Sequence, residues 1–257
     1  MSEPWALRLY NQSPLKRDKV SAIFSLLGDV RDQRCLDLGS DNGVVSLLLR
    51  RRGGSWASGD LTEETVESIR ALVATDVHLV TEQSLPFLDD TFDTVVVADM
   101  IEHVHDEATF VSELSRVLKP RGRLIVNTPH ANDTWLRRLR LALGQTDERH
   151  GHARHGYTRE SIGALLKGDF ELESSATYGR VFSEIIDTAM QWALERLGKK
   201  GSPKGMVITG GDLNRHARLF KAYSLVFPFV WAFSRLDRLV PWTEGYRLLV
   251  GARRKAS

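Results

Sequence analysis

The stretch CLDLGSDNGVV, residues 35–45, joins an apolar run, an acid, a glycine-spaced turn and the start of a helical pattern. Glycines such as Gly39 and Gly43 let a backbone turn sharply and let a ligand approach the main chain closely. The helix that follows would offer unpaired N–H groups to an anionic group. The loop is shorter than the G-x-G-x-x-G dinucleotide fingerprint, and Asp41 stands at its centre. Taken alone, the stretch is compatible with a cofactor loop, a damaged cofactor loop or only a tight turn.

The composition indicates one large α/β domain, or such a domain with an elaborated cap. The 257 residues are 42% hydrophobic and 26% charged, which is ordinary for a chain with a buried core. The net charge of +2 does not by itself indicate nucleic-acid binding. Cys35, the single cysteine, fits a reducing compartment, and the N-terminus shows no apolar signal segment. No window reaches the roughly 18 apolar residues of a membrane-spanning helix, so we expect a cytoplasmic protein.

Strand-like and helix-like patterns alternate on both sides of the opening stretch. The expected strands are residues 34–38, 55–60, 77–80, 93–99 and 123–129, and the expected helices between them are residues 44–52, 62–73 and 107–118. This alternation predicts βαβ units and a mainly parallel sheet. The chain therefore divides into an N-terminal helical segment (1–30), a cofactor-binding core (31–130) and a substrate or cap region (131–257). The last region is expected to hold a helical insert at 181–243 and a final strand at 245–254.

Four features follow successive expected strands, where an open parallel sheet places its ligand. The first is the glycine turn itself, and the second is Asp60, an acid able to accept both hydroxyls of a ribose. The third is the run from Thr81 to Asp93, and the fourth is the segment DMIEHV from Asp99 to Val104. The glycine turn is a weak signal alone, but the four in this order are a strong one.

Residues 34–129 resemble the core of class I S-adenosylmethionine-dependent methyltransferases of the small-molecule, type 11 sort. The resemblance is carried by LDLGSDNG, the acid in SGDL, SLPFLDDTFDTVVVADMIEHV and LSRVLKPRGRLIVNTP. It implies a Rossmann-like fold with a mainly parallel seven-stranded sheet, helices on both faces and a helical cap before the last strand. Residues 170–178 and 245–254 would supply an antiparallel edge.

The same resemblance implies S-adenosylmethionine as the cofactor. The residues that it assigns to cofactor binding are Asp37, Gly39, Ser40, Asp41, Gly43, Asp60, Leu61, Glu82, Asp99 and Met100. In this assignment Asp60 holds the ribose, Leu61 and Glu82 lie beside the adenine, and Asp99 and Met100 line the floor near the methyl group. Asp41 and Thr81 depart from the family pattern. Asp41 is interpreted as a cap of its own helix, with impaired cofactor binding as the alternative.

Catalytic candidates come from the histidine-rich loop at 150–157 and from the turn after the fourth strand. They are His152, His155, Tyr157 and His103. Each is a candidate base or substrate contact, and a polar structural loop is the alternative for 150–157. No metal site is expected there, because no cysteine or acid pair completes a ligand set.

Residues 213–243 combine aromatic side chains with flanking arginines and lysines. This pattern fits a cap helix packed on the domain, a large aromatic substrate pocket, or an interfacial segment that contacts a membrane peripherally at its inner face. The basic residues Lys16, Arg17 and Lys19 form either a solvated helix face or an active-site lid.

The sequence therefore predicts a methyltransferase whose acceptor is a small molecule, a glycan or a lipid-linked intermediate, methylated on oxygen by in-line transfer. The alternatives are carbon methylation of an isoprenoid quinone-type ring, and a catalytically silent binding subunit. Nucleic acid is not expected as a partner, because ADMIEHV stands where DNA methyltransferases carry a [DN]-P-P-[YF] motif.

Overall fold

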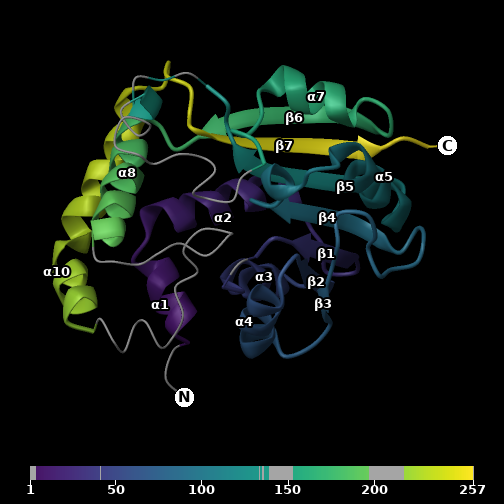
Figure 1. The fold of residues 1–257 in the computed structure, drawn as a ribbon, viewed down its shortest axis with the longest axis horizontal. Helices are drawn as coiled ribbons and strands as arrows, with labels where there is room; N and C mark the ends of the chain where they lie inside the picture. Colours follow the sequence, from purple (N-terminus) through teal and green to yellow (C-terminus); the bar gives the residue numbers. More distant parts are fainter. Residues whose placement is uncertain are drawn as a thin grey trace.

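A computed structural model of the protein describes residues 4–40, 42–132, 134, 136–138, 153–196 and 217–256. Within these residues, seven strands form one sheet with the order β3-β2-β1-β4-β5-β7-β6, flanked by helices (Figure 1). The strands are β1 (Arg34–Leu38), β2 (Ser55–Asp60), β3 (Val77–Leu79), β4 (Phe92–Ala98), β5 (Leu118–Pro129), β6 (Phe170–Tyr178) and β7 (Arg247–Arg254). The main helices are α1 (Trp5–Asn11), α2 (Pro14–Leu27), α3 (Val44–Arg50), α4 (Glu63–Val73), α5 (Glu107–Val117), α7 (Arg159–Leu166), α8 (Val181–Arg196) and α10 (Ala217–Ser234). Short 3₁₀ turns are η1 (Ile101–His103) and η3 (Arg235–Leu239).

The first five strands run parallel, and the last two run antiparallel to their neighbours. β1 lies between β2 and β4, with Leu36 level with Ala57 on one side and with Val95 on the other. β7 inserts antiparallel between β5 and β6. The valine run of β4 is fully buried, as expected for a strand covered on both faces. The predicted fold class is confirmed, including the antiparallel edge and the helical insert before the last strand.

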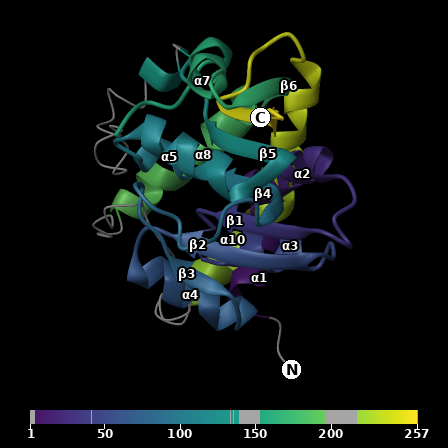
Figure 2. The same ribbon diagram turned by 90° about the vertical axis from the view of Figure 1, so that its right-hand side faces the viewer.

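Helices cover both faces of the sheet, so each strand contributes to two separate parts of the core. On one face, α5 and α7 pack on residues such as Leu36 and Val95. On the other face, α2 and α3 pack on Cys35 and Val96. Figure 2 shows α5 on one side of the strands and α2 and α3 on the other. This division follows from the alternation of side chains along a strand.

The structure corrects the boundaries of some expected elements. β5 begins at Leu118 rather than at Arg123, because Leu118 already pairs with Phe92 before the register shifts near Thr94. α3 ends at Arg50, and β3 ends at Leu79. Of the helices in the described part of the chain, none is both long and apolar enough to cross a membrane.

The cap is built from α8, α10 and η3, which follow β6 and precede β7. α8 and α10 lie side by side at the left edge of the molecule, next to α2 (Figure 1). Asp237 of η3 accepts hydrogen bonds from the backbone N–H groups of Arg180 and Phe182, both at 2.8 Å. Asp237 therefore fixes the start of α8 against the end of α10.

Candidate cofactor and acceptor site

The loop after β1 passes directly against the end of β4. Gly39 and Gly43 both have positive φ, at +84° and +77°. A Cβ atom on Gly39 would lie 2.3 Å from the carbonyl oxygen of Ala98 and 2.8 Å from the Cβ of Met100. Only glycine satisfies both the left-handed backbone and this close approach. The glycine that the sequence places at position 39 is thus required by the contact between the ends of β1 and β4.

Asp37, near the end of β1, stabilises the loop after β1 through side-chain hydrogen bonds. Its carboxylate accepts from the hydroxyls of Ser46 on α3, at 2.6 Å, and of Ser58 on β2, at 3.0 Å. Burial raises the pKa of Asp37 to about 6, although the Ser46 hydrogen bond and the Arg50 charge oppose the rise. Asp37 thus joins β1, α3 and β2 beneath the glycine turn.

The start of α3 differs from the expected anion site. The backbone N–H of Val44 donates to Asn42 Oδ1 at 3.3 Å, and that of Ser46 donates to Ser40 Oγ at 2.9 Å. The expectation of unpaired N–H groups is therefore wrong for these two amides, since neighbouring side chains already accept from them. Asp41, which was expected to cap this helix, lies outside the described residues.

Asp60 ends β2 at the same edge of the sheet and is fully buried. Its Oδ1 accepts from the backbone N–H of Leu61 at 2.7 Å, and Leu61 packs half-buried on the core. The N–H of Gly39 donates to the carbonyl of Gly59 at 3.1 Å, so the acid follows directly beside the glycine turn. This position agrees with that expected of a ribose-binding acid.

Asp99 is the most heavily contacted acid of the site and joins three distant parts of the chain. Its Oδ1 accepts from the Asn127 amide at 2.8 Å and from Arg247 at 2.9 Å. Its Oδ2 accepts from Lys19 at 2.8 Å. The residue has φ +51°, a left-handed conformation that aspartate tolerates better than most residues. Two cations and an amide thus fix this carboxylate at the end of β4.

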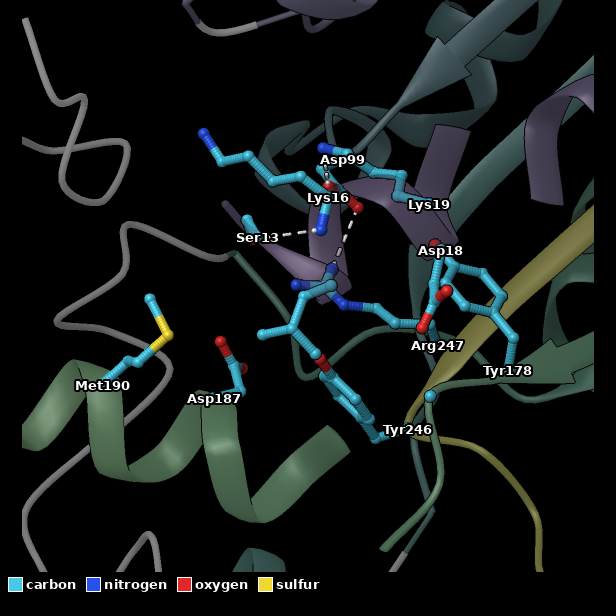
Figure 3. A pocket seen from close by; sticks show the side chains of 12 residues that line it. Ser13, Lys16, Asp18, Lys19, Asp99, Tyr178, Asp187, Met190, Tyr246 and Arg247 are labelled. Atoms are coloured by element: carbon cyan, nitrogen blue, oxygen red, sulfur yellow. Dashed lines mark hydrogen bonds and ion pairs between the residues drawn. The ribbon is translucent and has the colours of Figure 1, made fainter. Parts of the chain in front are cut away.

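A pocket of about 230 Å³ opens beside Asp99, between α2 and α8 (Figure 3). Lys19 and Arg247 converge on Asp99 at one side of the pocket, and Asp187 and Met190 face it from α8 (Figure 3). The residues that line it are Ser13, Leu15, Lys16, Asp18, Lys19, Asp99, Tyr178, Gly179, Asp187, Met190, Tyr246 and Arg247. The pocket therefore combines charged groups with aromatic and aliphatic walls at the strand end where Asp99 and Met100 were expected.

Glu102 lies beneath this region as a second, buried acid. Its side chain is 1% exposed and accepts from the Thr128 hydroxyl at 3.2 Å. Burial, with the neighbouring charge of Asp99, raises the pKa of Glu102 to about 8. Glu102 is therefore mostly protonated at neutral pH.

The described part of the histidine-rich loop is anchored to the segment after β4. The N–H of Ala153 donates to the carbonyl of Glu102 at 2.9 Å, and Arg154 donates to the carbonyl of Val104 at 3.0 Å. Tyr157 is buried, its hydroxyl lies 2.7 Å from Glu107 Oε1, and burial raises its pKa well above the usual range. This environment favours a positioning role for Tyr157 over a base.

The remaining candidates lie apart from one another. His155 is exposed, His103 is half-buried in η1, and His152 lies outside the described residues. Glu82 accepts from the backbone N–H of His105 at 2.6 Å, which lowers its pKa and ties the loop after β3 to the segment after η1. Among described residues, no group of three potential ligands could hold a metal ion.

Sequence reasoning missed several residues that the structure brings to the pocket. Arg247 and Tyr178 come from β7 and β6, and behind them the Tyr178 hydroxyl donates to Oδ1 of the buried Asn127 on β5. Lys19 belongs to the basic segment that was interpreted as either a solvated face or a lid, and its side chain is only 16% exposed. The sequence did contain a sign that Lys19 is not simply a solvated residue, because it shares one helix face with apolar residues.

Comparison with known proteins identifies the core of the chain. Residues 36–126 match the family described as a methyltransferase domain. A ubiquinone biosynthesis O-methyltransferase of Xylella fastidiosa is 31% identical over 127 residues, which is 47% of this chain and 50% of the relative. One of Parvibaculum lavamentivorans is 28% identical over 44% of this chain and 48% of the relative. The chain thus spans about half the length of the curated relatives it matches.

Solved structures share the fold over nearly the whole chain at low sequence identity. A putative methyltransferase from Bacillus halodurans has a TM-score of 0.59 at 16% identity, covering 93% of this chain and 100% of that chain. The [4+2]-cyclase SpnF has a TM-score of 0.62 at 17% identity, covering 94% and 82%. The resemblance to class I methyltransferases is confirmed for the core, and it implies S-adenosylmethionine as the cofactor.

The residues present fit this cofactor. A buried carboxylate at the end of β2, Asp60, supplies acceptors for ribose hydroxyls. Gly39 leaves the main chain uncovered by a side chain at the adjacent turn, and the partly buried Leu61 supplies apolar surface. We therefore propose the shared edge of β1, β2 and β4 as the place of the cofactor.

Replacing Gly39 tests the contact on which this edge depends. We expect Gly39→Ala to lower the free energy of unfolding by more than about 1–2 kcal/mol, the usual cost of a left-handed residue, because the new Cβ also overlaps the Ala98 carbonyl. Urea unfolding measures the change. Gly168→Ala is the matched control, since its Cβ would meet no atom within 4 Å. Equal losses of stability in the two variants would contradict the close contact between Gly39 and the Ala98 carbonyl.

The buried acid predicts a pH dependence of stability. The folded protein retains a proton on Glu102 that the unfolded chain releases above its ordinary pKa of 4.5. Stability contributed by this proton is therefore lost as pH rises from about 4.5 to about 8. Glu102→Gln should be more stable relative to wild type at high pH, measured by urea unfolding between about pH 5 and about pH 9. The exposed Glu171→Gln is the control, and parallel profiles for Glu102→Gln and wild type would refute the prediction.

Proposed function

From the methyltransferase core at residues 36–126, we propose that this protein transfers the methyl group of S-adenosylmethionine to an oxygen atom of a small-molecule, glycan or lipid-linked acceptor. One observation carries the proposal. Gly39, Asp60 and Asp99 lie at the ends of the adjacent strands β1, β2 and β4, and a pocket of about 230 Å³ opens beside Asp99. Cofactor residues and an acceptor-sized space therefore share one edge of the sheet.

In this proposal the chain acts chiefly by binding and positioning. Asp60 accepts the ribose hydroxyls, the Gly39 turn lets the cofactor lie against the backbone, and Met100 lines the floor. When bound, S-adenosylmethionine supplies an electrophilic methyl group on a sulfonium. α2 and α8 border the acceptor pocket. Alignment of two reactants in this way is sufficient for a large part of the acceleration of a displacement.

An acceptor hydroxyl also has to lose a proton. Asp99 is poorly suited to accept it, since Lys19, Arg247 and Asn127 already stabilise its ionised form. We propose His103 or His155 as the base, with His152 a further candidate from the sequence. The hydrogen bond of Tyr157 to Glu107 supports a role in positioning the loop that carries His155.

Two alternatives remain in the proposal. The names of the matched relatives favour an acceptor from quinone biosynthesis that is methylated on oxygen. The first alternative is methylation of a carbon atom of an isoprenoid quinone-type ring. The fold similarity to a [4+2]-cyclase shows that the architecture alone does not determine the chemistry. A silent binding subunit is the second alternative.

We also propose peripheral contact of the cap with the inner face of a membrane, through the segment 213–243. Leu225, Val226, Phe229 and Phe233 fall on one face of α10 by helical spacing and are 79%, 51%, 75% and 38% exposed. Leu239 and Trp242, later in the chain, are 66% and 77% exposed. Contiguous exposed apolar groups of this kind mark an interaction surface, and insertion into a bilayer interface would bury them.

Replacing the ribose acid tests the enzymatic proposal. We expect Asp60→Asn to weaken S-adenosylmethionine binding by about tenfold or more, since a charged hydrogen-bond acceptor is lost. Calorimetry measures the affinity, and transfer of a labelled methyl group to phenolic, glycan and lipid fractions measures activity. Asp169→Asn, on an exposed turn, is the control. Absence of cofactor binding by wild type would refute the proposal, and binding without transfer to any fraction would favour the silent subunit.

The membrane proposal has a separate test. We expect Leu225→Ser combined with Phe229→Ser to reduce co-sedimentation with phosphatidylcholine vesicles without lowering the thermal midpoint, because both side chains are largely exposed. Leu88→Ser is the matched control, as Leu88 is 83% exposed on a distant loop. If the double variant and wild type sediment alike, α10 does not contact the membrane.

A further inference from the structure

A second cavity, of about 310 Å³, lies between α2, the end of β6 and η3. Its lining residues are Asp18, Ser21, Ala22, Ser25, Tyr178, Gly179, Arg180, Ser234, Arg235, Asp237 and Arg238. Three guanidinium groups therefore line the cavity together with two carboxylates and three serine hydroxyls. The proposed methyl transfer uses none of these arginines.

Both acids of this cavity are already engaged. The two oxygens of Asp237 accept the backbone N–H groups of Arg180 and Phe182. Asp18 pairs with Arg235 at 3.2 Å. The carboxylates thus serve to hold α8 and α2 in place, and the cavity keeps an excess of positive charge.

Two of the arginines retain donors for a further acceptor. The Nε of Arg235 is buried and has no hydrogen-bond partner, and the guanidinium lies 5.2 Å from the ring centre of Trp231. A buried donor without an acceptor is unusual and costly in a folded protein. Arg238 is exposed and makes no hydrogen bond or ion pair with another described residue. The planar fork of arginine matches the oxygens of a phosphate group.

Apolar side chains surround the same short segment. Leu239 follows Arg238 directly in η3, and Trp242 lies just beyond it, at 66% and 77% exposure. A free phosphate would leave these groups in water. A phospholipid would satisfy both features, because its phosphate and its acyl chains are adjacent, and tryptophan favours the membrane interface.

We infer that this cavity binds the phosphate of an anionic phospholipid headgroup, held by Arg235 and Arg238, while Leu239 and Trp242 enter the adjoining interface. The inference rests on the proposed membrane contact and is independent of methyl transfer. The cavity shares Asp18, Tyr178 and Gly179 with the pocket beside Asp99. A bound headgroup would therefore place the acceptor pocket next to the bilayer surface.

Binding of a short-chain, water-soluble phosphatidylglycerol to the full chain tests this inference without a membrane. Calorimetry should show binding by wild type and a loss of about tenfold or more for Arg238→Gln, as expected for one charged hydrogen-bond donor. Arg238 is exposed, so its replacement should leave the fold intact. Arg159→Gln, an exposed arginine at the start of α7, is the control and should bind as wild type does. Arg235→Gln should reproduce the loss if it remains folded by circular dichroism.

Vesicles and inorganic phosphate separate the sources of the phosphate group. Wild type should prefer phosphatidylcholine vesicles that contain phosphatidylglycerol over phosphatidylcholine alone, and Arg238→Gln should lose that preference. Inorganic phosphate bound as tightly as the lipid would overturn the headgroup assignment, as would equal lipid binding by wild type and Arg238→Gln. If wild type prefers vesicles with phosphatidylglycerol but does not bind S-adenosylmethionine, the proposed methyl transfer is contradicted and the headgroup site is not.

Discussion

The carboxylate of Asp99 is the interaction on which the described site depends. Lys19, Asn127 and Arg247 converge on it from α2, β5 and β7. An isolated aspartate in a left-handed conformation would be costly to bury, but these donors compensate for its desolvation. The N-terminal helices, the parallel core and the antiparallel edge thus meet at one ionised group. The pocket of about 230 Å³ lies where they meet.

Local patterns were sufficient to predict the parallel core but not the pairing around Asp99. β4 could be predicted because its valines and its flanking acids are contiguous, and Gly39 because a turn at a strand end needs glycine. Lys19 and Arg247 are far from Asp99 in sequence, and only the sheet order brings them together. The prediction of unpaired N–H groups at the start of α3 was wrong for a related reason. Whether its amides are unpaired depends on the rotamers of Ser40 and Asn42, which residue spacing does not determine.

The core and the cap use their apolar residues differently. Core residues such as Phe92 and Phe110 are fully buried between sheet and helix. Leu225 and Phe229 of α10 are largely exposed, although α10 is rich in apolar residues. Packing on α8 and α2 satisfies only part of the surface of α10. The cap therefore presents exposed apolar side chains on α10, whereas the core buries its own.

The position of β7 has a consequence for the order in which the molecule is assembled. β7 is the last described strand to be synthesised, yet it lies between β5 and β6. While the ribosome is still adding residues 181–246, β6 has no partner strand in the sheet, because it pairs only with β7. Arg247, the first residue of β7, then completes the environment of Asp99. The nascent chain can thus pair its five parallel strands early, but the surroundings of Asp99 are complete only after β7 has left the exit tunnel.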